Sequence, residues 1–348
     1  MPKVEDLKEI LQVDVNGFCI PASAENQQFC LTDVHFRLHE RESLGILGVS
    51  GCGKTTLLRL IAGLFPFGSL SGSISMAVEA GRLQEIRHLA PAQLYDRLQL
   101  VFQDSAGSCY GEESLGSVFS HIRKKRRSSK EKIIGLAREF LKQLGLLDRK
   151  DTETLFAQKF HSLSMGEKRR FCLLKAVMQL DIYSEGHERQ PKILLVDEVS
   201  RGLDEETCLR MINFLWMVRE KYNIAIIAIS HELDFLQPFC SNYLFLFEGL
   251  QIPRLYSPGE LDKCAPCQKQ TEKTAAKECG KPVSPYICYL LRGEEPPGTG
   301  DLLPEEIRHW QEHKEENSCL FFQHYFCHKF SPRKCSPKQG VKTPWICA

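Results

Sequence analysis

The sequence lacks long apolar runs and has no excess of charge of one sign. No stretch reaches the ~18 consecutive apolar residues typical of a membrane-spanning helix, so we expect no such helix. Its 45 basic and 44 acidic residues leave a net charge of +1, which gives no general attraction to nucleic acid or anionic lipid. The first residues, MPKVEDLKEI, lack the apolar core of a secretion signal. We therefore expect neither a nucleic-acid partner nor export from the cell.

Cysteine, by contrast, is abundant, with 15 residues in a chain of 348. Because no secretion signal is present, we expect thiols or metal ligands rather than disulfides. Eight of the cysteines lie near the C-terminus, namely Cys264, Cys267, Cys279, Cys288, Cys319, Cys327, Cys335 and Cys347. This shift in composition predicts two units, residues 1–257 and a cysteine-rich extension over 258–348.

Apolar strands alternate with amphipathic helices through the first unit. Strands are predicted at residues 43–48, 97–103, 192–197 and 224–230, with a hairpin over 243–252. Helical spacing follows residue 54, dominates from about 130 to 180 and returns over 206–222. Continuous β-branched runs suit strands covered on both faces. The pattern therefore predicts an α/β fold on a mostly parallel sheet.

A glycine-rich loop, GVSGCGKTT, follows the first of these strands and opens a helix. It matches G-x-x-x-x-G-K-[ST], whose backbone N–H groups surround phosphate. Lys54 is placed to reach the β- and γ-phosphates of ATP, Thr55 to bind Mg²⁺ and Thr56 to support the phosphates. The candidate nucleotide-binding residues are Gly48, Ser50, Gly51, Cys52, Gly53, Lys54, Thr55 and Thr56.

Polar side chains end three other predicted strands. Asp197 follows KILLV and is placed to bind Mg²⁺, and Glu198 to orient and deprotonate the attacking water. Gln103 ends RLQLVFQ, where a neutral amide suits both Mg²⁺ and that water. His231 follows the strand after the Asp–Glu pair and is placed to contact the γ-phosphate or the water. Together with the glycine-rich loop these residues predict hydrolysis of a nucleotide.

The stretch SLSMGEKRRF, residues 162–171, taken alone indicates only a helix start. Ser164 stands three residues before Glu167, as in a capping box, and apolar residues at helical spacing follow. With the other motifs, in the order glycine-rich loop, Gln, LSMGE, Asp–Glu, SRGLD and His, the chain resembles the ATP-binding-cassette (ABC) ATPases over roughly residues 10–257.

The resemblance implies a P-loop ABC ATPase core with a small antiparallel β subdomain and a helical subdomain at about 105–180. It also implies that two cassettes close on two ATP molecules. Ser164, Gly166 and Glu167 would then face the γ-phosphate held by the partner's loop, and Asp204 of SRGLD would lie at the interface. Phe18 is expected to stack on adenine, with Phe29 as the alternative and an ordinary core position as a third reading.

Three positions depart from the family pattern. Met165 replaces glycine, Glu167 replaces glutamine and Val199 replaces a frequent proline. Met165 restricts the backbone if a positive φ is needed there. Glu167 adds negative charge beside a triphosphate, unless its carboxylate folds back onto the Ser164 N–H. We therefore expect this signature to serve the partner's ATP less well, so that restoring glycine and glutamine raises the ATPase rate.

Two stretches, VFQDSAGSCYGEESLGSVF and SPYICYLLRGEEPPG, resemble the ATPases of oligopeptide, dipeptide and nickel importers. Some of those ATPases carry a four-cysteine iron–sulfur cluster after the core, and thiolates suit such a cluster. The corresponding residues here are Cys319, Cys327, Cys335 and Cys347. A zinc site involving the CAPC sequence, or reduced thiols throughout, remain the alternatives.

The resemblance implies an ATP- and Mg²⁺-dependent subunit that powers an importer, with oligopeptides or dipeptides as its cargo. Its expected partners are integral-membrane permease subunits, a second ABC ATPase in a homo- or heterodimer and, indirectly, an extracytoplasmic solute-binding protein. Its expected location is the cytoplasmic face of the plasma (inner) membrane. The alternatives are a nickel or metal importer, a soluble ABC ATPase of the carbon–phosphorus lyase type, and a weakly catalytic structural cassette, against which Glu198 and His231 argue.

Overall fold

A mixed β-sheet flanked by helices forms the core of this computed structural model. The structure describes residues 8–21, 29–65, 70–79, 81–102, 111–126, 129–148, 150–180, 182–183, 190–247, 249–252 and 255–262. In this part of the chain no helix is long and apolar enough to cross a membrane. Gln103 lies outside the described residues, and so does the cysteine-rich extension beyond residue 262.

Ten strands form the sheet in the order β5-β4-β1-β2-β10-β9-β3-β8-β7-β6. The strands are β1 (Glu9–Ile20), β2 (Phe29–His39), β3 (Ser43–Leu47), β4 (Leu70–Glu79), β5 (Arg82–Glu85), β6 (Leu98–Val101), β7 (Lys192–Asp197), β8 (Ile224–Ile229), β9 (Asn242–Phe247) and β10 (Leu250–Gln251). The strands β9, β3, β8, β7 and β6 run parallel to one another, whereas β5, β4, β1 and β2 pair antiparallel. The predicted strands β3, β6, β7 and β8 and the β9–β10 hairpin are confirmed.

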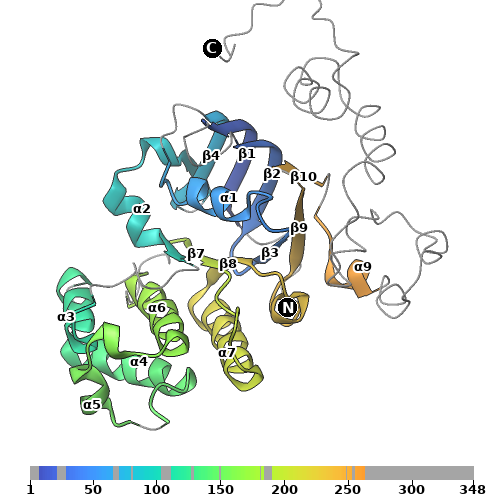
Figure 1. Cartoon of the computed structure of the whole chain (residues 1–348). Coiled ribbons are helices and arrows are strands. Elements are labelled where there is room, and N and C mark those ends of the chain that lie inside the picture. The colour runs from blue at the N-terminus through green and yellow to red at the C-terminus, as the bar shows by residue number, and fades with distance from the viewer. Residues whose placement is uncertain are drawn as a thin grey trace, which may run out of the picture.

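Nine α-helices surround the described part of the sheet. The helices are α1 (Lys54–Ile61), α2 (Pro91–Arg97), α3 (Leu115–Arg126), α4 (Lys130–Gln143), α5 (Thr152–Ala157), α6 (Met165–Gln179), α7 (Glu205–Tyr222), α8 (Leu233–Leu236) and α9 (Pro258–Asp262), and short 3₁₀ turns lie at Ile86–His88 and Phe160–Ser162. In Figure 1 the green helices α3 to α6 gather beside the β7 side of the parallel strands, away from the blue antiparallel strands. The predicted helical region of 130–180 is therefore a cluster of separate helices.

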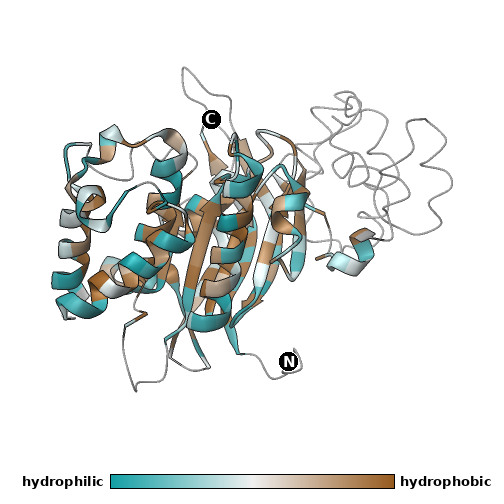
Figure 2. Ribbon diagram, turned by 90° about the horizontal axis from the view of Figure 1, so that it is seen from below, coloured by the Kyte–Doolittle hydropathy of each residue, from teal (hydrophilic) through white to brown (hydrophobic). Residues whose placement is uncertain are grey.

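Two hydrophobic cores fix the two faces of the parallel strands. One core packs α1 residues such as Leu57 and Ile61 against both β1 residues such as Val13 and parallel-strand residues such as Ile227. The other packs α3, α4, α6 and α7 against the opposite face, with Phe140 edge-on to Phe214 at a centroid distance of 5.2 Å. Figure 2 shows apolar strands in the middle and polar stretches on the flanking helices. Burial on both faces explains the uninterrupted apolar runs of β7 and β8.

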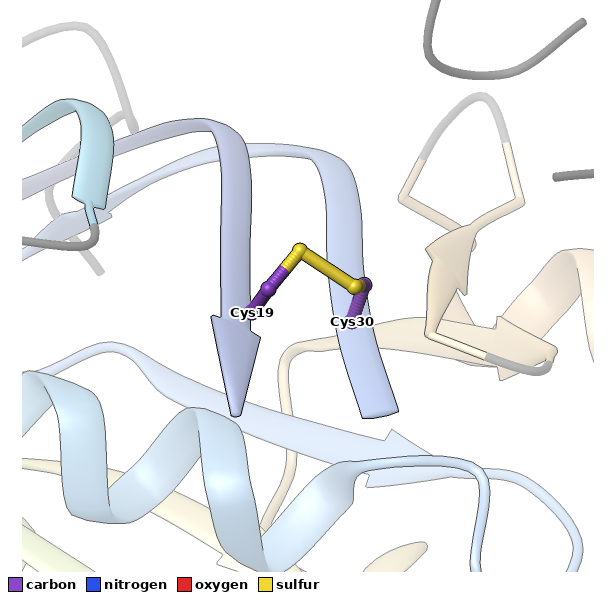
Figure 3. Close-up of a disulfide and its surroundings, with 2 residues drawn as sticks. All are labelled: Cys19 and Cys30. Atoms are coloured by element: carbon purple, nitrogen blue, oxygen red, sulfur yellow. A yellow bond between two sulfur atoms is a disulfide. The ribbon is translucent and has the colours of Figure 1, made fainter. Parts of the chain in front are cut away.

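A disulfide joins β1 to β2, contrary to the expectation of thiols or metal ligands. Cys19 and Cys30 are direct partners in the antiparallel register, their Cα atoms are 4.1 Å apart and their sulfurs are bonded (Figure 3). Strand register is a tertiary property, so the positions of the cysteines in the sequence did not reveal this pair. Four further described cysteines, Cys52, Cys172, Cys208 and Cys240, form no disulfide.

Candidate nucleotide-binding site

The carboxyl ends of neighbouring parallel strands bring the predicted site together. The phosphate loop follows β3, Asp197 ends β7 and is followed by Glu198, and His231 comes two residues after β8. Because β3, β8 and β7 are adjacent and parallel, these groups share one edge of the sheet. Residue 103 follows β6, the next strand along, but lies outside the described residues.

The phosphate loop needs glycine at Gly53. Its φ is +104°, and a Cβ there would lie 2.5 Å from the Phe29 ring and 2.9 Å from Leu31 Cδ2. Ser50 and Gly51 are exposed at the tip of the loop, whereas Gly48, Cys52 and Gly53 are buried. Phe29 and Leu31 therefore leave no space for a side chain at Gly53, while the tip of the loop is exposed to solvent.

Lys54 carries the cation of the loop and is 5% exposed. Its ammonium donates to the Gly48 carbonyl at 2.8 Å and to the Val49 carbonyl at 2.9 Å. Cys52 lies beside it, with 4.0 Å between Lys54 Nζ and the thiol sulfur. Burial raises the pKa of Cys52, although the nearby ammonium opposes this. The thiol is therefore a packing group of the loop, and the ammonium lies among the loop carbonyls next to the expected phosphates.

Thr55 and Asp197 meet across the site and fit the Mg²⁺ that the motif implies. The Thr55 hydroxyl donates to Asp197 Oδ1 at 3.1 Å, and Asp197 is 2% exposed. Burial raises the pKa of Asp197, while the hydrogen bond from Thr55 lowers it. Hydroxyl and carboxylate oxygens are ligands that Mg²⁺ prefers. A divalent cation beside this pair would favour the ionised carboxylate.

Glu198 and His231 form a close pair. His231 Nε2 lies 2.6 Å from Glu198 Oε1, and Arg201 Nη1 lies 3.9 Å from the other carboxylate oxygen. Glu198 is 8% exposed and adopts a positive φ of 46°, which is uncommon for a residue with a side chain. Its N–H donates to the Ile229 carbonyl at 3.1 Å. A carboxylate thus lies beside an imidazole at the carboxyl edge of the sheet, an arrangement that suits proton abstraction from water.

The LSMGE stretch forms the capped start of α6. Ser164 is the N-cap; its hydroxyl accepts from the Glu167 N–H at 3.2 Å, and Glu167 Oε2 accepts from the Ser164 N–H at 2.8 Å. The carboxylate of Glu167 therefore does fold back. Met165 is 54% exposed and is not among the described residues with positive φ, so its backbone conformation does not require glycine. The backbone is therefore not strained at Met165, and the Glu167 carboxylate takes the folded-back position.

The SRGLD loop lies next to the start of α6. A Cβ on Gly166 would lie 3.3 Å from Leu203 Cδ2, and Arg169 donates to the Arg201 carbonyl. Asp204 caps α7 by accepting from the Thr207 N–H at 2.9 Å and from its hydroxyl. These hydrogen bonds lower the pKa of Asp204. Asp204 therefore has a structural role within this chain.

Phe18 does not offer a free ring face for adenine. It is 2% exposed and packs against Phe65 at a centroid distance of 5.3 Å, as expected of a core residue. The alternative, Phe29, is half-buried and lies against Gly53 of the phosphate loop. Phe29 is therefore an aromatic residue beside this loop, whereas the burial of Phe18 argues against the preference for it.

Lys150 is a neighbour of the site that the sequence did not indicate. Its ammonium donates to Glu167 Oε1 at 2.8 Å and to Gln158 Oε1 at 3.0 Å. It lies 17 residues before Glu167, in the segment between α4 and α5. No motif or spacing marked this lysine, because the contact joins the α4–α5 connection to the first turn of α6.

This chain is similar to known proteins in sequence and in fold. The family described as ABC transporter matches residues 31–201. The energy-coupling factor transporter ATP-binding protein EcfA1 of Levilactobacillus brevis is 30% identical over 214 residues, 60% of this chain and 67% of its own length. The nickel import ATP-binding protein NikE of Pseudomonas putida is 29% identical over 223 residues, 63% of this chain and 74% of its own length. The dimeric ATP-binding cassette MJ0796, in a post-hydrolysis state with ADP and phosphate, superimposes with a TM-score of 0.57 at 20% identity, over 72% of this chain and 99% of its own.

Proposed function

We propose that this chain, which belongs to the ABC transporter family and is an ATP-hydrolysing transporter subunit, powers solute uptake through separate permease subunits. One observation carries the assignment of the site: the phosphate loop, Asp197, Glu198 and His231 converge on one sheet edge. The 1–257 segment would form the ATPase domain, and 258–348 a separate extension.

Different residues at this sheet edge would bind the phosphates, hold Mg²⁺ and activate the water in ATP hydrolysis. Lys54 and the loop N–H groups would bind the phosphates, and Thr55 and Asp197 would hold Mg²⁺. Gln103, which follows β6 in the sequence, would contact the same cation. The cation supplies charge neutralisation of the phosphates when it is bound. Glu198 would take the proton of the attacking water, and the imidazole of His231 would keep its carboxylate oriented.

A second ATPase subunit would complete the site. The start of α6 presents the Ser164 hydroxyl and the Gly166 N–H at the positive end of a 15-residue helix, where an anion is favoured. These groups would contact the γ-phosphate bound to the partner, with Asp204 of the adjacent SRGLD loop near the interface. The dimeric state of the similar cassette MJ0796 supports this assembly.

The cargo is assigned from the family resemblance, with oligopeptides or dipeptides first and nickel second. The similarity to a nickel import ATP-binding protein favours the second candidate, and that to an energy-coupling factor protein widens the choice. In any of these cases the chain would sit at the cytoplasmic face of the plasma membrane. A solute-binding protein outside the membrane would select the cargo in the peptide or nickel systems.

Copurification and hydrolysis assays test the proposal. The tagged full-length chain should copurify from solubilised membranes with permease subunits, and the complex should release phosphate from ATP in the presence of Mg²⁺. Lys54→Ala should abolish phosphate release and leave the complex assembled. A chain that remains soluble and alone, yet hydrolyses ATP, would replace the importer by the permease-free alternative.

A metal or iron–sulfur site at the C-terminal cysteines remains a prediction from the sequence. In the described residues no group of three or more His, Cys, Asp or Glu side chains could hold a metal ion. The four candidate ligands, Cys319, Cys327, Cys335 and Cys347, lie outside those residues. Iron, sulfide and zinc analysis of anaerobically purified protein would separate a cluster from a zinc site or free thiols.

A further inference from the structure

The position where the family has glutamine carries a charged side chain, Glu167, that is fully engaged. One carboxylate oxygen accepts from the Ser164 N–H at 2.8 Å, and the other accepts from the Lys150 ammonium at 2.8 Å. Both contacts are short enough to be charge-assisted hydrogen bonds. The side chains of Lys150 and Glu167 are only 27% and 22% exposed, so solvent screens the pair less than a surface pair.

Lys150 is the cation that directly contacts this carboxylate in the described structure. The other nearby cation, Arg170, donates instead to the Leu144 carbonyl at 2.9 Å and to the Gly166 carbonyl at 3.3 Å. Burial would raise the pKa of Glu167, but the hydrogen bonds from Lys150 and Ser164 bring it below its usual value. The carboxylate is therefore ionised and is neutralised locally by Lys150.

An unneutralised carboxylate at this place would oppose phosphate binding. It lies in the first turn of α6, the same turn that presents the Ser164 hydroxyl and the Gly166 N–H. A negative charge there repels a triphosphate and competes for the positive end of the helix. A neutral glutamine would need no such compensation, whereas glutamate needs a cation on its far side.

We propose that Lys150 is a positioning residue of the signature stretch, which neutralises Glu167 and holds it on the Ser164 N–H so that the first turn of α6 can receive the partner's γ-phosphate. This inference rests on the proposed ATPase dimer. It assigns to the α4–α5 connection a role in hydrolysis at the neighbouring nucleotide. It also replaces the expectation that Glu167 simply weakens the site.

The test compares lysine variants in the copurified full complex. Lys150→Gln should lower the maximal rate of ATP hydrolysis about two- to fivefold, the range for one partly exposed ion pair. Lys150→Arg, which retains the charge, should restore most of that rate. MgADP affinity should not change, because ADP has no γ-phosphate. Lys159→Gln is the matched control, since Lys159 lies just after α5 and pairs instead with the exposed Glu112.

A second background separates charge compensation from a purely structural role. In Glu167→Gln complexes, the additional Lys150→Gln substitution should have no further effect on the hydrolysis rate. If Lys150→Gln lowers the hydrolysis rate by the same factor with Glu167 and with Gln at position 167, Lys150 acts through its contact with Gln158 and the proposal fails.

The controls also separate this inference from the proposed function. If the unsubstituted complex neither binds nor hydrolyses ATP, the proposed function fails. If the unsubstituted complex hydrolyses ATP and the Lys150→Gln complex does so at the same rate, only the proposed role of Lys150 is refuted. Equal urea midpoints for all variants would show that the rates do not report misfolding.

Discussion

Replacing Gly53 by alanine tests whether the phosphate loop is packed as tightly as the structure indicates. The φ of +104° costs an alanine about 1–2 kcal/mol. The added Cβ would also lie 2.5 Å from Phe29 and 2.9 Å from Leu31, and such overpacking costs typically about 1–3 kcal/mol. Gly53→Ala should therefore destabilise the protein by about 2–5 kcal/mol.

Gly81→Ala is the matched control. Gly81 also has a positive φ, +76°, but no heavy atom of the described residues lies within 4 Å of its Cβ position. Its alanine variant should show only the backbone cost. The two variants should differ by about 1–3 kcal/mol, which is about 0.3–1 M in urea midpoint for a slope near 3 kcal/mol per M.

Nucleotide binding provides a second readout for this pair. Gly53→Ala should lose ATP affinity, because Phe29 or the loop must move, whereas Gly81→Ala should retain it. Equal urea midpoints for the two variants would refute the claim that Phe29 and Leu31 confine the loop.

Three further predictions follow from contacts in and around the site. Glu198→Gln should slow phosphate release by about 10²–10⁴-fold while equilibrium ATP binding is retained; an unchanged rate would exclude Glu198 as the base. Because burial raises the pKa of Asp197, and because only its ionised form binds Mg²⁺ well, Mg²⁺-dependent ATP binding should weaken with acidification earlier than at an unperturbed aspartate; calorimetric titrations across mildly acidic pH check this. Breaking the Cys19–Cys30 bond with dithiothreitol should lower the free energy of unfolding by about 3 kcal/mol, as expected for a sequence separation of 11. The same reductant should have no effect on the C19S/C30S variant.

The parallel half of the fold was predictable because its signals are local. Each of β7 and β8 is buried on both faces and reads as an unbroken apolar run. In such a sheet a polar residue directly after a run must lie at the carboxyl edge. The sequence therefore sufficed to bring Asp197, Glu198 and His231 to one place.

The remaining features depend on register and on distant packing. Phe18 lies in β1, where the face a side chain takes depends on pairing with β2, and the sequence could not show that it points into the core. The same register brings Cys19 opposite Cys30. Lys150 lies in the α4–α5 connection and contacts Glu167 at the start of α6 only in the folded chain, so no spacing rule identifies it.

The two halves of the sheet are joined by a narrow seam at β10. Leu250 pairs with Thr32 of β2, and the preceding Gly249 carbonyl accepts from the Thr32 N–H at 2.8 Å. The N–H of Gly249 donates to the Cys52 carbonyl of the phosphate loop at 2.9 Å. Gly249 thus fastens the loop to the antiparallel half. A displacement of the antiparallel strands relative to the parallel strands would strain both hydrogen bonds of Gly249. We therefore expect nucleotide binding at the phosphate loop to be coupled, through this residue, to the position of the antiparallel strands.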